Sequence, residues 1–415
     1  MSPSPRAVVL AALLALSLAV LPVGVVVLGA VVLAAVVVVD AVAARRPPAL
    51  HRQVPGTLAR GVAAPMAAGV APAGASSVQV RQPLVPDVSV DPAEHDGTRA
   101  MAVVASRRGY HVLPPVTVRA TGPLRLGRWD HTLGTDESIH VYPDLPNARR
   151  IATAVRQGRF HDPGERRRGP LGLGTEFETI RDYQPDDDVR QINWVATARA
   201  GRPMSNQFRQ DTERDVLGVV DAGRLMTAPV LDRTRLDAAL DALVAVAAVA
   251  DVLGDRCGAI AFDDRVRRRV RPRRAGGEAV VRTFHDLEPS SVDSDYELAF
   301  RSLGTTKRSL VIVFTDLLEE AAARPLLEAV PTRVRRHADI VATSSDPELD
   351  AMVAAEPRKV SDVYVAAVAT EVLAGRTAVA ADLTRAGAVV VDAPPDLLAA
   401  RCVGAYLRLK AQARV

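Results

Sequence analysis

The chain has 415 residues, with 52 lysines and arginines against 48 aspartates and glutamates, and two cysteines. Two cysteines without a Cys-x-x-Cys neighbour exclude a disulfide-rich secreted scaffold and give no sign of zinc or thioredoxin chemistry. The net charge is only +4, aromatic residues make up 4%, and the arginines are spread along the chain, which argues against a nucleic-acid-binding protein. Cys257 and Cys402 lie in apolar segments, so we expect two buried free thiols in a reducing compartment.

An uncharged run of Ala, Val and Leu residues, from Ala7 to Val39, is the first predicted element. One helix over the whole run would be about 50 Å long, whereas the hydrocarbon core of a bilayer is about 30 Å thick. Pro22 and Gly24 interrupt the run, which favours a hairpin of two short transmembrane helices, about 7–21 and 23–39. A single tilted helix stays an alternative. A cleaved signal peptide is disfavoured because its apolar region would span only about 7–15 residues.

The charges that flank this run predict the orientation of the membrane anchor, which comprises residues 1–48. Only Arg6 precedes the run, whereas four arginines follow it: Arg45, Arg46, Arg52 and Arg60. The positive-inside rule then places the region after Val39 in the cytoplasm. We therefore expect a multi-pass protein of the cell membrane, inner or plasma, with cytoplasmic soluble domains.

Residues 49–146 hold short runs of alternating or β-branched residues separated by Gly, Pro and Asp, among them SSVQVRQPLV, AMAVVASRRG and YHVLPPVTVRA. Such spacing predicts a small antiparallel β-sandwich. Residues 147–214 are predicted to hold an amphipathic helix over 147–160, an arginine-rich loop and a linker.

Residues 215–415 alternate between apolar strands and helices. The predicted strands include VLGVVD, CGAIAFDD, RVRRRVRP, RSLVIVFTD, RHADIVATSS and VVVDA. Helices between nearly continuous apolar strands predict an α/β domain with a doubly wound, mostly parallel sheet.

Polar residues at the ends of these strands are the candidates for chemistry, because open α/β sheets bind ligands at the carboxyl ends of their strands. Asp221 ends one strand, and Thr315 and Asp316 end another, which gives oxygen ligands of the kind that hard cations prefer. The alternative is that Asp221 and Asp316 cap the following helices, and both interpretations stay open. Asp263 and Asp264 are expected in a tight turn between two strands.

This topology and the placing of Asp221 and Asp316 resemble the von Willebrand factor A domain. That domain carries a metal site written Asp-x-Ser-x-Ser after its first strand, completed by a Thr and an Asp from later loops. Asp221 and Asp316 match its first and last positions, whereas Gly223 and Leu225 stand where the two serines would be. The middle Thr has no clean match, although Ser294–Tyr296 falls in about the right place.

Without the two serine oxygens we expect at most weak Mg²⁺ binding and no other cofactor, because Mg²⁺ demands near-octahedral oxygen coordination. The degenerate ion-site loop would keep its shape and serve as a surface for a protein partner. We expect Arg224, Leu225 and Met226 to be exposed there as a mixed polar and apolar contact. The residues assigned to this degenerate site are Asp221, Gly223, Arg224, Leu225, Thr315 and Asp316, with Asp221 and Asp316 as weak metal ligands.

The segment before the first strand of the α/β region resembles the signature of a bacterial membrane family known as domain of unknown function 58. That pattern runs Gly, Glu-Phe, Arg-x-Tyr, Pro-Gly-Asp-Asp, Arg-x-Ile-x-Trp and a terminal Ala-Arg. Asp186 replaces the usual Gly, and Asn193 replaces a usual Asp. The resemblance extends to the β region, the hairpin and the A-domain-like end. The matching residues are Gly174, Glu176, Phe177, Arg181, Tyr183, Pro185, Asp187, Asp188, Arg190, Ile192, Trp194, Ala198 and Arg199.

The signature gathers charged and aromatic side chains in a short space, which has two interpretations. It is either a structural clasp that joins the linker to the α/β domain or a surface that recognises a partner. In a clasp, Arg181 and Arg190 would form bidentate pairs with the aspartates between them. We also expect Trp194 to be a largely buried ring that anchors the linker. The residues assigned to the clasp or partner surface are Glu176, Phe177, Arg181, Tyr183, Asp187, Asp188, Arg190, Trp194 and Arg199.

The family resemblance implies a membrane-anchored, non-enzymatic adaptor that works with a MoxR-type AAA+ ATPase in assembling or maturing envelope or metal-dependent complexes. Its partners would be membrane lipid and that ATPase, and no nucleic acid. The alternative is a Mg²⁺-dependent hydrolase that uses Asp221 and Asp316. No Ser–His–Asp, Cys–His or paired-carboxylate arrangement emerges from the sequence, so the adaptor is favoured. The client complex, the particular ATPase and the oligomeric state stay open.

Overall fold

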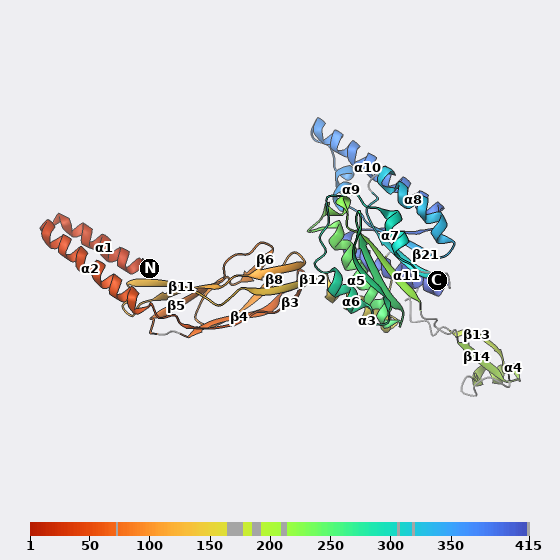
Figure 1. Cartoon of the computed structure of the whole chain (residues 1–415), viewed down its shortest axis with the longest axis horizontal. Coiled ribbons are helices and arrows are strands. Elements are labelled where there is room, and N and C mark those ends of the chain that lie inside the picture. Colours follow the sequence, from red (N-terminus) through yellow and green to blue (C-terminus); the bar gives the residue numbers. More distant parts are fainter. Residues whose placement is uncertain are drawn as a thin grey trace. The chain divides into compact units, whose positions relative to one another are not determined.

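The chain forms two compact units in the computed structural model, Met1–Tyr142 and Pro143–Val415 (Figure 1). The first unit joins apolar helices to β-sheets, and the second surrounds a mixed sheet with helices, so the predicted α/β class is confirmed. The structure describes residues 1–71, 74–163, 177–184, 192–208, 214–304, 308–317 and 320–412.

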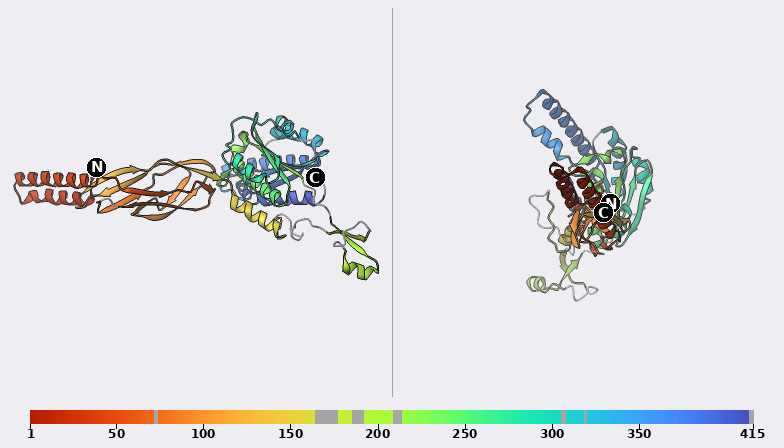
Figure 2. Two further views of the ribbon diagram at one scale, coloured as in Figure 1. Left: turned by 60° about the horizontal axis from the view of Figure 1, so that its bottom comes forward. Right: turned by 90° about the vertical axis from the view of Figure 1, so that its left-hand side faces the viewer.

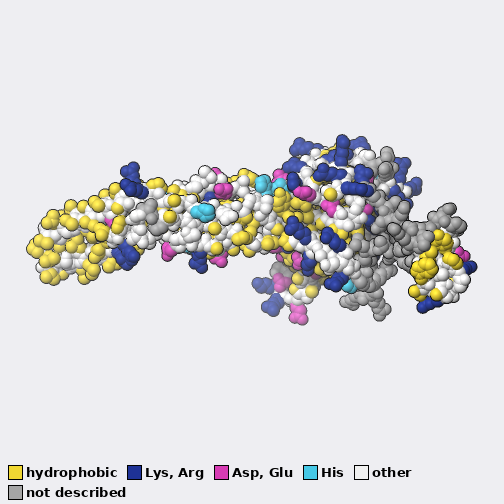
Figure 3. Space-filling model, turned by 90° about the horizontal axis from the view of Figure 1, so that it is seen from below, with side chains coloured by type: hydrophobic (Ala, Val, Ile, Leu, Met, Phe, Trp, Pro, Cys, Tyr) yellow, Lys and Arg dark blue, Asp and Glu magenta, His cyan; other side chains and the backbone are white. Residues whose placement is uncertain are grey.

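Two apolar helices open the first unit, α1 (Pro5–Leu16) and α2 (Val23–Ala43). The Ser4 hydroxyl caps α1 by accepting a 3.2 Å hydrogen bond from an amide of its first turn. A 3₁₀ turn over Ser17–Ala19 follows α1, and the break falls at Pro22, where the sequence predicts it. Hydrophobic side chains cover both helices on the face shown in Figure 3.

Two helices of the described chain are long and apolar enough to cross a membrane, α2 and α10 (Val360–Arg385). Both are mostly exposed, whereas α1 with its 3₁₀ turn is shorter than a full span. Length and composition alone support membrane association only weakly.

Three sheets make up the rest of the first unit. The strands of the first sheet, in order, are β1 (Ser2–Pro3), β11 (Gly127–Leu133), β10 (Val116–Thr121), β5 (Ser77–Arg81) and β7 (Glu94–Asp96). Those of the second are β2 (Ala49–Gln53), β4 (Ala64–Ala71), β8 (Arg99–Ala105) and β6 (Val88–Asp91). Those of the third are β3 (Thr57–Ala59), β12 (Glu137–Tyr142) and β9 (Gly109–Leu113). One hydrophobic core joins all three sheets, with Val80, Val103 and Ile139 buried in it.

Asp40, near the end of α2, fastens the helices to the first sheet. Its carboxylate is 2% exposed and accepts hydrogen bonds from the amides of Leu124, Leu126 and Gly127, at 2.7–2.8 Å. These amides belong to the turn between β10 and β11. Three donors replace the water that a buried carboxylate loses. We name this contact between Asp40 and the three amides the Asp40 clasp, and it fixes α2 on this turn.

The close approach of α2 also explains the glycine at position 127. A Cβ atom there would lie 2.4 Å from the Ala41 nitrogen and from the Val37 oxygen, a distance that no side chain allows. The backbone of β11 can therefore touch α2 only where it carries no side chain.

The second unit is built on a six-stranded sheet. Its strands, in order, are β19 (Val266–Arg273), β18 (Arg256–Phe262), β15 (Asp215–Asp221), β20 (Ser309–Phe314), β21 (Ala338–Ser344) and β22 (Val389–Ala393). All pairs are parallel except β18 with β19, which is the only antiparallel pair of this described sheet. After β15 the chain moves first to β18 on one side and later to β20 on the other, so a topological switch point lies at the end of β15.

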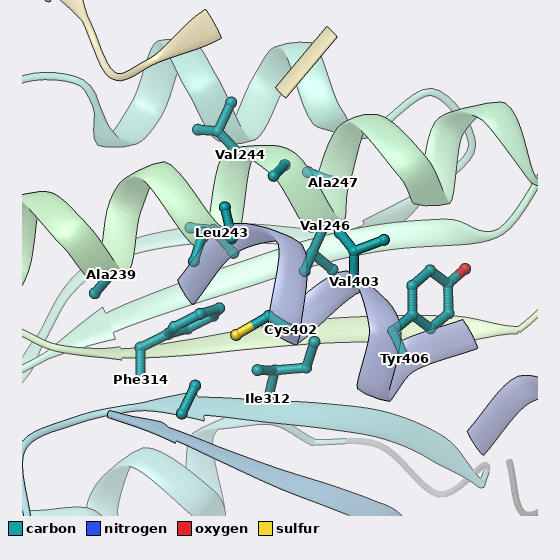
Figure 4. Packing of buried hydrophobic residues seen from close by; sticks show 14 of the residues in the cluster. Ala239, Leu243, Val244, Val246, Ala247, Ile312, Phe314, Cys402, Val403 and Tyr406 are labelled. Carbon is teal, nitrogen blue, oxygen red and sulfur yellow. The ribbon is translucent and has the colours of Figure 1, made fainter. Parts of the chain in front are cut away.

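Helices cover both faces of this sheet. One face packs against α5 (Arg235–Val252), α6 (Gly277–Phe284) and α11 (Pro395–Ala411), and α3 (Leu145–Arg156) packs on α5. The other packs against α7 (Tyr296–Ser302), α8 (Glu320–Val334) and α10. In Figure 4, Leu243 of α5 and Cys402 of α11 lie above Phe314 of β20. Cys257 and Cys402 are both free and buried, as predicted, and burial raises the pKa of each thiol.

No sequence pattern predicts an element over residues 347–385, where the structure has α9 (Pro347–Ala354) and α10. α9 has no buried residue, and α10 faces the core only in its second half, with Val379 and Leu383, while its first half has exposed apolar residues. The apolar periodicity of residues 347–385 therefore gives no clear pattern. The remaining small elements are β13 (Phe177–Asp182), α4 (Trp194–Ala200), β14 (Met204–Phe208), β16 (Pro229–Val230) and β17 (Arg233–Thr234).

Replacing Asp40 with alanine should destabilise the first unit by about 3 kcal/mol, because three amides, one buried and two partly buried, lose a charged acceptor. Hydrogen exchange of the β10–β11 turn in the full detergent-solubilised chain measures the effect. The matched control is Asp130→Ala, which removes an exposed ion pair with Arg119 in the same sheet and should cost no more than about 1 kcal/mol. An equal loss of protection from hydrogen exchange in the two variants would contradict the stabilising role of the Asp40 clasp.

Candidate functional site

The predicted site residues meet at the switch point of the second unit. Val220 of β15 pairs in register with Phe314 of β20, so the residues that follow each of them are neighbours. The Thr315 hydroxyl donates a 2.7 Å hydrogen bond to Asp221 Oδ2. The prediction that Asp221, Thr315 and Asp316 share the carboxyl edge of the sheet is therefore confirmed.

Asp221 is a buried carboxylate surrounded by neutral donors. Its Oδ1 atom accepts hydrogen bonds from the Gly223 amide at 2.8 Å and from the Ser294 hydroxyl at 2.5 Å. Its Oδ2 atom accepts from the Tyr296 hydroxyl at 3.0 Å as well as from Thr315. Within the described ranges no arginine or lysine forms an ion pair with Asp221. Four polar donors from three segments thus converge on one charge and hold the strand ends together.

Tyr296 supplies its donor from the first turn of α7. The ring packs edge-on against Phe262 with a centroid separation of 5.4 Å, and the residue is 4% exposed. Burial raises the pKa of Tyr296 well above its usual value, and the charge of Asp221 raises it further. The phenol therefore stays protonated at physiological pH and acts as a donor to Asp221.

Gly223 shows how this loop differs from a metal-binding loop. A Cβ atom at position 223 would lie 2.2 Å from the Ser294 hydroxyl oxygen and 3.2 Å from Asp221 Oδ1. The hydroxyl of Ser294 thus occupies the space into which a serine at 223 would project. Glycine at 223 and serine at 294 form a matched pair, and Ser294 was expected in the sequence only as an approximate match.

Asp316 has a different environment, because two buried arginines face it. Its Oδ1 atom accepts hydrogen bonds from Arg376 at 2.6 Å and from Arg235 at 3.1 Å. Arg235 comes from the first turn of α5 and Arg376 from α10, and both also donate to the Ser344 carbonyl at the end of β21. Burial lowers the pKa of Arg235, and the charge of Asp316 opposes that shift. The cluster ties two helices to the carboxyl edge of the sheet.

This donor set differs from the one that Mg²⁺ prefers. Each Asp221 oxygen already accepts two hydrogen bonds, and two guanidinium charges lie against Asp316. The described residues contain no group of three or more His, Cys, Asp or Glu side chains arranged to hold a metal ion. A divalent cation next to Asp316 would meet two positive charges at close range, so the residues present do not fit such an ion.

The loop after Asp221 is less exposed than predicted. Arg224 is exposed and forms an ion pair with Asp293, and Leu225 is half-buried. Met226 is only 1% exposed, so the expectation that it forms part of a surface contact is wrong. The 3₁₀ turn over Arg224–Thr227 directs Met226 into the core beside α5. The apolar part of the expected contact is therefore largely missing.

Asp263 lies in the tight turn that the sequence predicts between two strands. Its Oδ1 atom accepts a 3.1 Å hydrogen bond from the Arg265 amide, and Arg267 binds its Oδ2 atom. The antiparallel pair β18–β19 confirms a tight turn at Asp263 and Asp264.

The signature segment is described only in part. Glu176, Asp187, Asp188 and Arg190 lie outside the described residues, as do the side chains of Phe177 and Arg181. β13 pairs with β14 in an antiparallel ribbon. Among the described residues this ribbon has two strands. Asn193 caps α4 by accepting a 2.9 Å hydrogen bond from the Ala196 amide. In the described part, Tyr183 is half-buried and Arg199 is exposed.

The Trp194 side chain is 69% exposed, so the prediction of a buried ring is wrong. Trp194 is the first residue of α4, a helix of seven residues beside a two-stranded ribbon. So small an arrangement offers too little apolar surface to cover an indole. Val195 beside it is 66% exposed, so the two side chains form a small apolar surface.

Comparison with known proteins agrees with the signature. Residues 179–382 match the family described as "Protein of unknown function DUF58". The chain is also 29% identical over 154 residues to an uncharacterized protein of Mycobacterium bovis and to one of Mycobacterium tuberculosis. The matched stretch covers 35% of this chain and 48% of each relative, so the chain spans about half the length of the curated relatives it matches.

No sequence pattern predicts two further residues of the candidate site, Arg235 and Arg376. Arg376 lies beside Gly375 in an apolar stretch of helix, and a lone arginine in such surroundings is a signal of a buried partner. Its partner Asp316 is 60 residues away in sequence, and no local pattern connects the two.

Replacing Arg376 with methionine should destabilise the second unit by about 3 kcal/mol, because Asp316 then loses one of its two buried cations. Urea unfolding of the full chain, followed by circular dichroism, measures the change. Arg385→Met is the matched control on the same helix, since Arg385 forms only an exposed pair with Asp382 and should cost about 0.5 kcal/mol or less. Equal midpoints for both variants would show that the cluster does not secure α10.

Titration of Mg²⁺ into the full chain should give no saturable heat below about 1 mM, because a divalent cation lacks free ligands at Asp221 and is repelled at Asp316. Isothermal calorimetry after chelator treatment measures the binding. A micromolar dissociation constant that disappears in Asp221→Asn would overturn this expectation.

Proposed function

We propose that the protein is a membrane-anchored, non-enzymatic adaptor that binds a protein partner through its second unit. The observation that carries this proposal is the exposed apolar surface on α9 and the first half of α10, which we name the arm face. It holds seven of the twelve exposed large apolar side chains that the structure describes in the second unit. The arm face consists of Met352, Val353, Val360, Val363, Tyr364, Val365 and Val368.

An apolar surface of this kind marks a protein contact. Val360, Tyr364 and Val368 are 60–74% exposed and lie four residues apart, so they form one stripe along α10. In Figure 1, α9 and the first half of α10 extend beyond the other helices of this unit. Such a stripe suits an apolar groove on a partner, where a helix is recognised by residues at these spacings.

The charges around the arm face describe the partner further. Residues 347–371 contain five acidic and two basic side chains, although the chain as a whole has a net charge of +4. Acidic groups at the rim of an interface favour a partner with basic groups around its groove. The expected partner therefore has an apolar groove with a basic rim.

The alternative, a Mg²⁺-dependent hydrolase, would need Asp221 or Asp316 as a base or a metal ligand. Asp221 accepts hydrogen bonds from four donors, and two arginines bind Asp316 Oδ1. Asp316 Oδ2 has no hydrogen-bond partner among the described residues, but it is buried and the two adjacent guanidinium charges disfavour protonation of this carboxylate. These contacts favour an adaptor that works without metal or other cofactor.

The same proposal includes the fold family of the second unit, the partner and the location in the cell. The sheet order and the switch point at Asp221 support a von Willebrand factor A-like domain with a degenerate ion site. The family resemblance supports a MoxR-type AAA+ ATPase as the partner, in assembly or maturation of envelope or metal-dependent complexes. The apolar helices and the arginines after α2 support anchoring in the cell membrane, with the sheets of the first unit and the whole second unit on the cytoplasmic side.

The test uses the full chain in lipid nanodiscs and the purified MoxR-type ATPase of the same organism, with ATP, ADP or no nucleotide. Surface plasmon resonance should show nucleotide-sensitive binding. Tyr364→Ala should weaken it at least about tenfold, because the exposed ring would be an anchor residue of the contact. Leu231→Ala removes another exposed apolar side chain of this unit and should leave the affinity unchanged.

Three outcomes would contradict parts of this proposal. Absence of ATPase binding in every nucleotide state would refute the ATPase as partner. A larger loss in Arg224→Ala than in Tyr364→Ala would place the contact at the sheet edge instead of the arm face. Phosphatase or peptidase turnover by the purified chain would favour the hydrolase.

A further inference from the structure

We propose that the hairpin of α1 and α2 enters the bilayer from the side of the β-sheets and that its turn ends inside the hydrocarbon, without reaching the water on the far side. This inference rests on the membrane anchoring proposed above. It concerns the depth of insertion, which length and composition alone do not give.

Both ends of the hairpin are fixed to the same turn of the first sheet. The Ser4 amide donates to the Leu126 carbonyl at 2.8 Å, and its hydroxyl donates to the Arg125 carbonyl at 2.6 Å. Asp40 holds the amides of this turn, as described above. The start of α1 and the end of α2 therefore lie together beside the sheets, and the hairpin turn lies at the opposite end (Figure 2). A hairpin fixed in this way enters and leaves the bilayer on one side.

The hairpin is shorter than the hydrocarbon is thick. α1 has 12 residues and its 3₁₀ turn has three, which together reach about 24 Å. α2 has 21 residues, but the last four begin at Asp40, so 17 residues reach about 26 Å from the polar end. The hydrocarbon core is about 30 Å thick, and any tilt shortens the reach of the helices further.

The turn has none of the residues that hold a helix end at a membrane surface. Between Leu16 and Gly24 the only polar side chain is Ser17, and its hydroxyl donates to the Leu14 carbonyl at 2.6 Å. Leu16 is 76% exposed and Val20 is 87% exposed, so water on the far side would meet large apolar side chains. Burial of the turn in hydrocarbon removes this contact with water.

The opposite end of the hairpin does have such residues. Arg6 is the second residue of α1, and Arg45 and Arg46 follow α2. The Arg45 guanidinium lies 5.8 Å from the centre of the Trp129 ring, which pairs an aromatic and a cationic anchor at this end. Aromatic and basic anchors mark membrane surfaces, and here they occur at the sheet end alone among residues 1–48 and β11.

The backbone of the turn satisfies part of its own hydrogen bonding, which burial in hydrocarbon requires. The amides of Val20 and Leu21 both donate to the Ser17 carbonyl, at 3.0 and 2.8 Å. The amides of Val25 and Val26 donate to the Pro22 carbonyl, at 3.0 and 3.3 Å. Proline at 22 adds no donor of its own. The turn therefore carries few amides that need water.

The test labels single added cysteines in the full chain with a membrane-impermeant maleimide, in right-side-out and inside-out membrane vesicles. Val20→Cys places a thiol in the turn, and Leu124→Cys places one on the sheet side, where the side chain is 61% exposed. Cys257 and Cys402 are buried, and the unsubstituted chain measures their background. Leu124→Cys should react in the vesicle type that exposes the sheet side, at least about tenfold faster than Val20→Cys. Val20→Cys should stay unreactive in both vesicle types and become reactive only in detergent, because hydrocarbon excludes the reagent.

Spin-label power saturation at the same two positions separates a buried turn from one in the far headgroups. A label at Val20→Cys should be more accessible to oxygen than to a water-soluble nickel complex, and the label at Leu124→Cys should show the reverse. Maleimide labelling of Val20→Cys from the side opposite to Leu124→Cys, or nickel access equal at both positions, would overturn the inference. Release of the chain from membranes by alkaline carbonate would instead refute the anchoring itself.

Discussion

A carboxylate that leaves water must find donors inside the protein, and three buried aspartates of this chain organise their surroundings for that reason. Asp40 gathers three backbone amides and thereby attaches the helical hairpin to a sheet. Asp221 gathers hydroxyls from separate segments and closes the carboxyl edge of the second sheet. Asp316 gathers two arginines and attaches two helices. Each aspartate sits where chain segments far apart in sequence have to meet.

The buried charges of Asp221 and Asp316 are stabilised in different ways. Around Asp221 the donors are neutral, so its negative charge is spread over hydrogen bonds without a counterion. Around Asp316 the charge is met by guanidinium groups from Arg235 and Arg376. A fold that binds a cation between such aspartates would leave both free to share it. In this chain each aspartate is engaged separately, and the contacts of the two join strands and helices at this edge of the sheet.

The sequence predicted much of this junction because the relevant rule is local. A strand that ends in an aspartate points it to the carboxyl edge, so Asp221, Thr315 and Asp316 could be placed together without a structure. The arginines could not be predicted, since they come from helices 60 and 81 residues away and only tertiary packing brings them to Asp316. The prediction of a buried Trp194 is wrong for another reason: burial depends on a neighbouring surface, which the residue type alone does not reveal. The arm face was missed for a related reason: its apolar residues face outward.

The Asp40 clasp has a mechanical consequence for the first unit. Because the carboxylate and Ser4 hold both ends of the hairpin on one sheet turn, no flexible segment separates the helices from the sheets. Any inclination of the hairpin is then passed on to the sheets as a rigid rotation. In a bilayer, the thickness of the lipid would set the angle of the hairpin and, through it, the height at which the sheets stand above the surface. Lipid composition would thereby affect the orientation of the sheets.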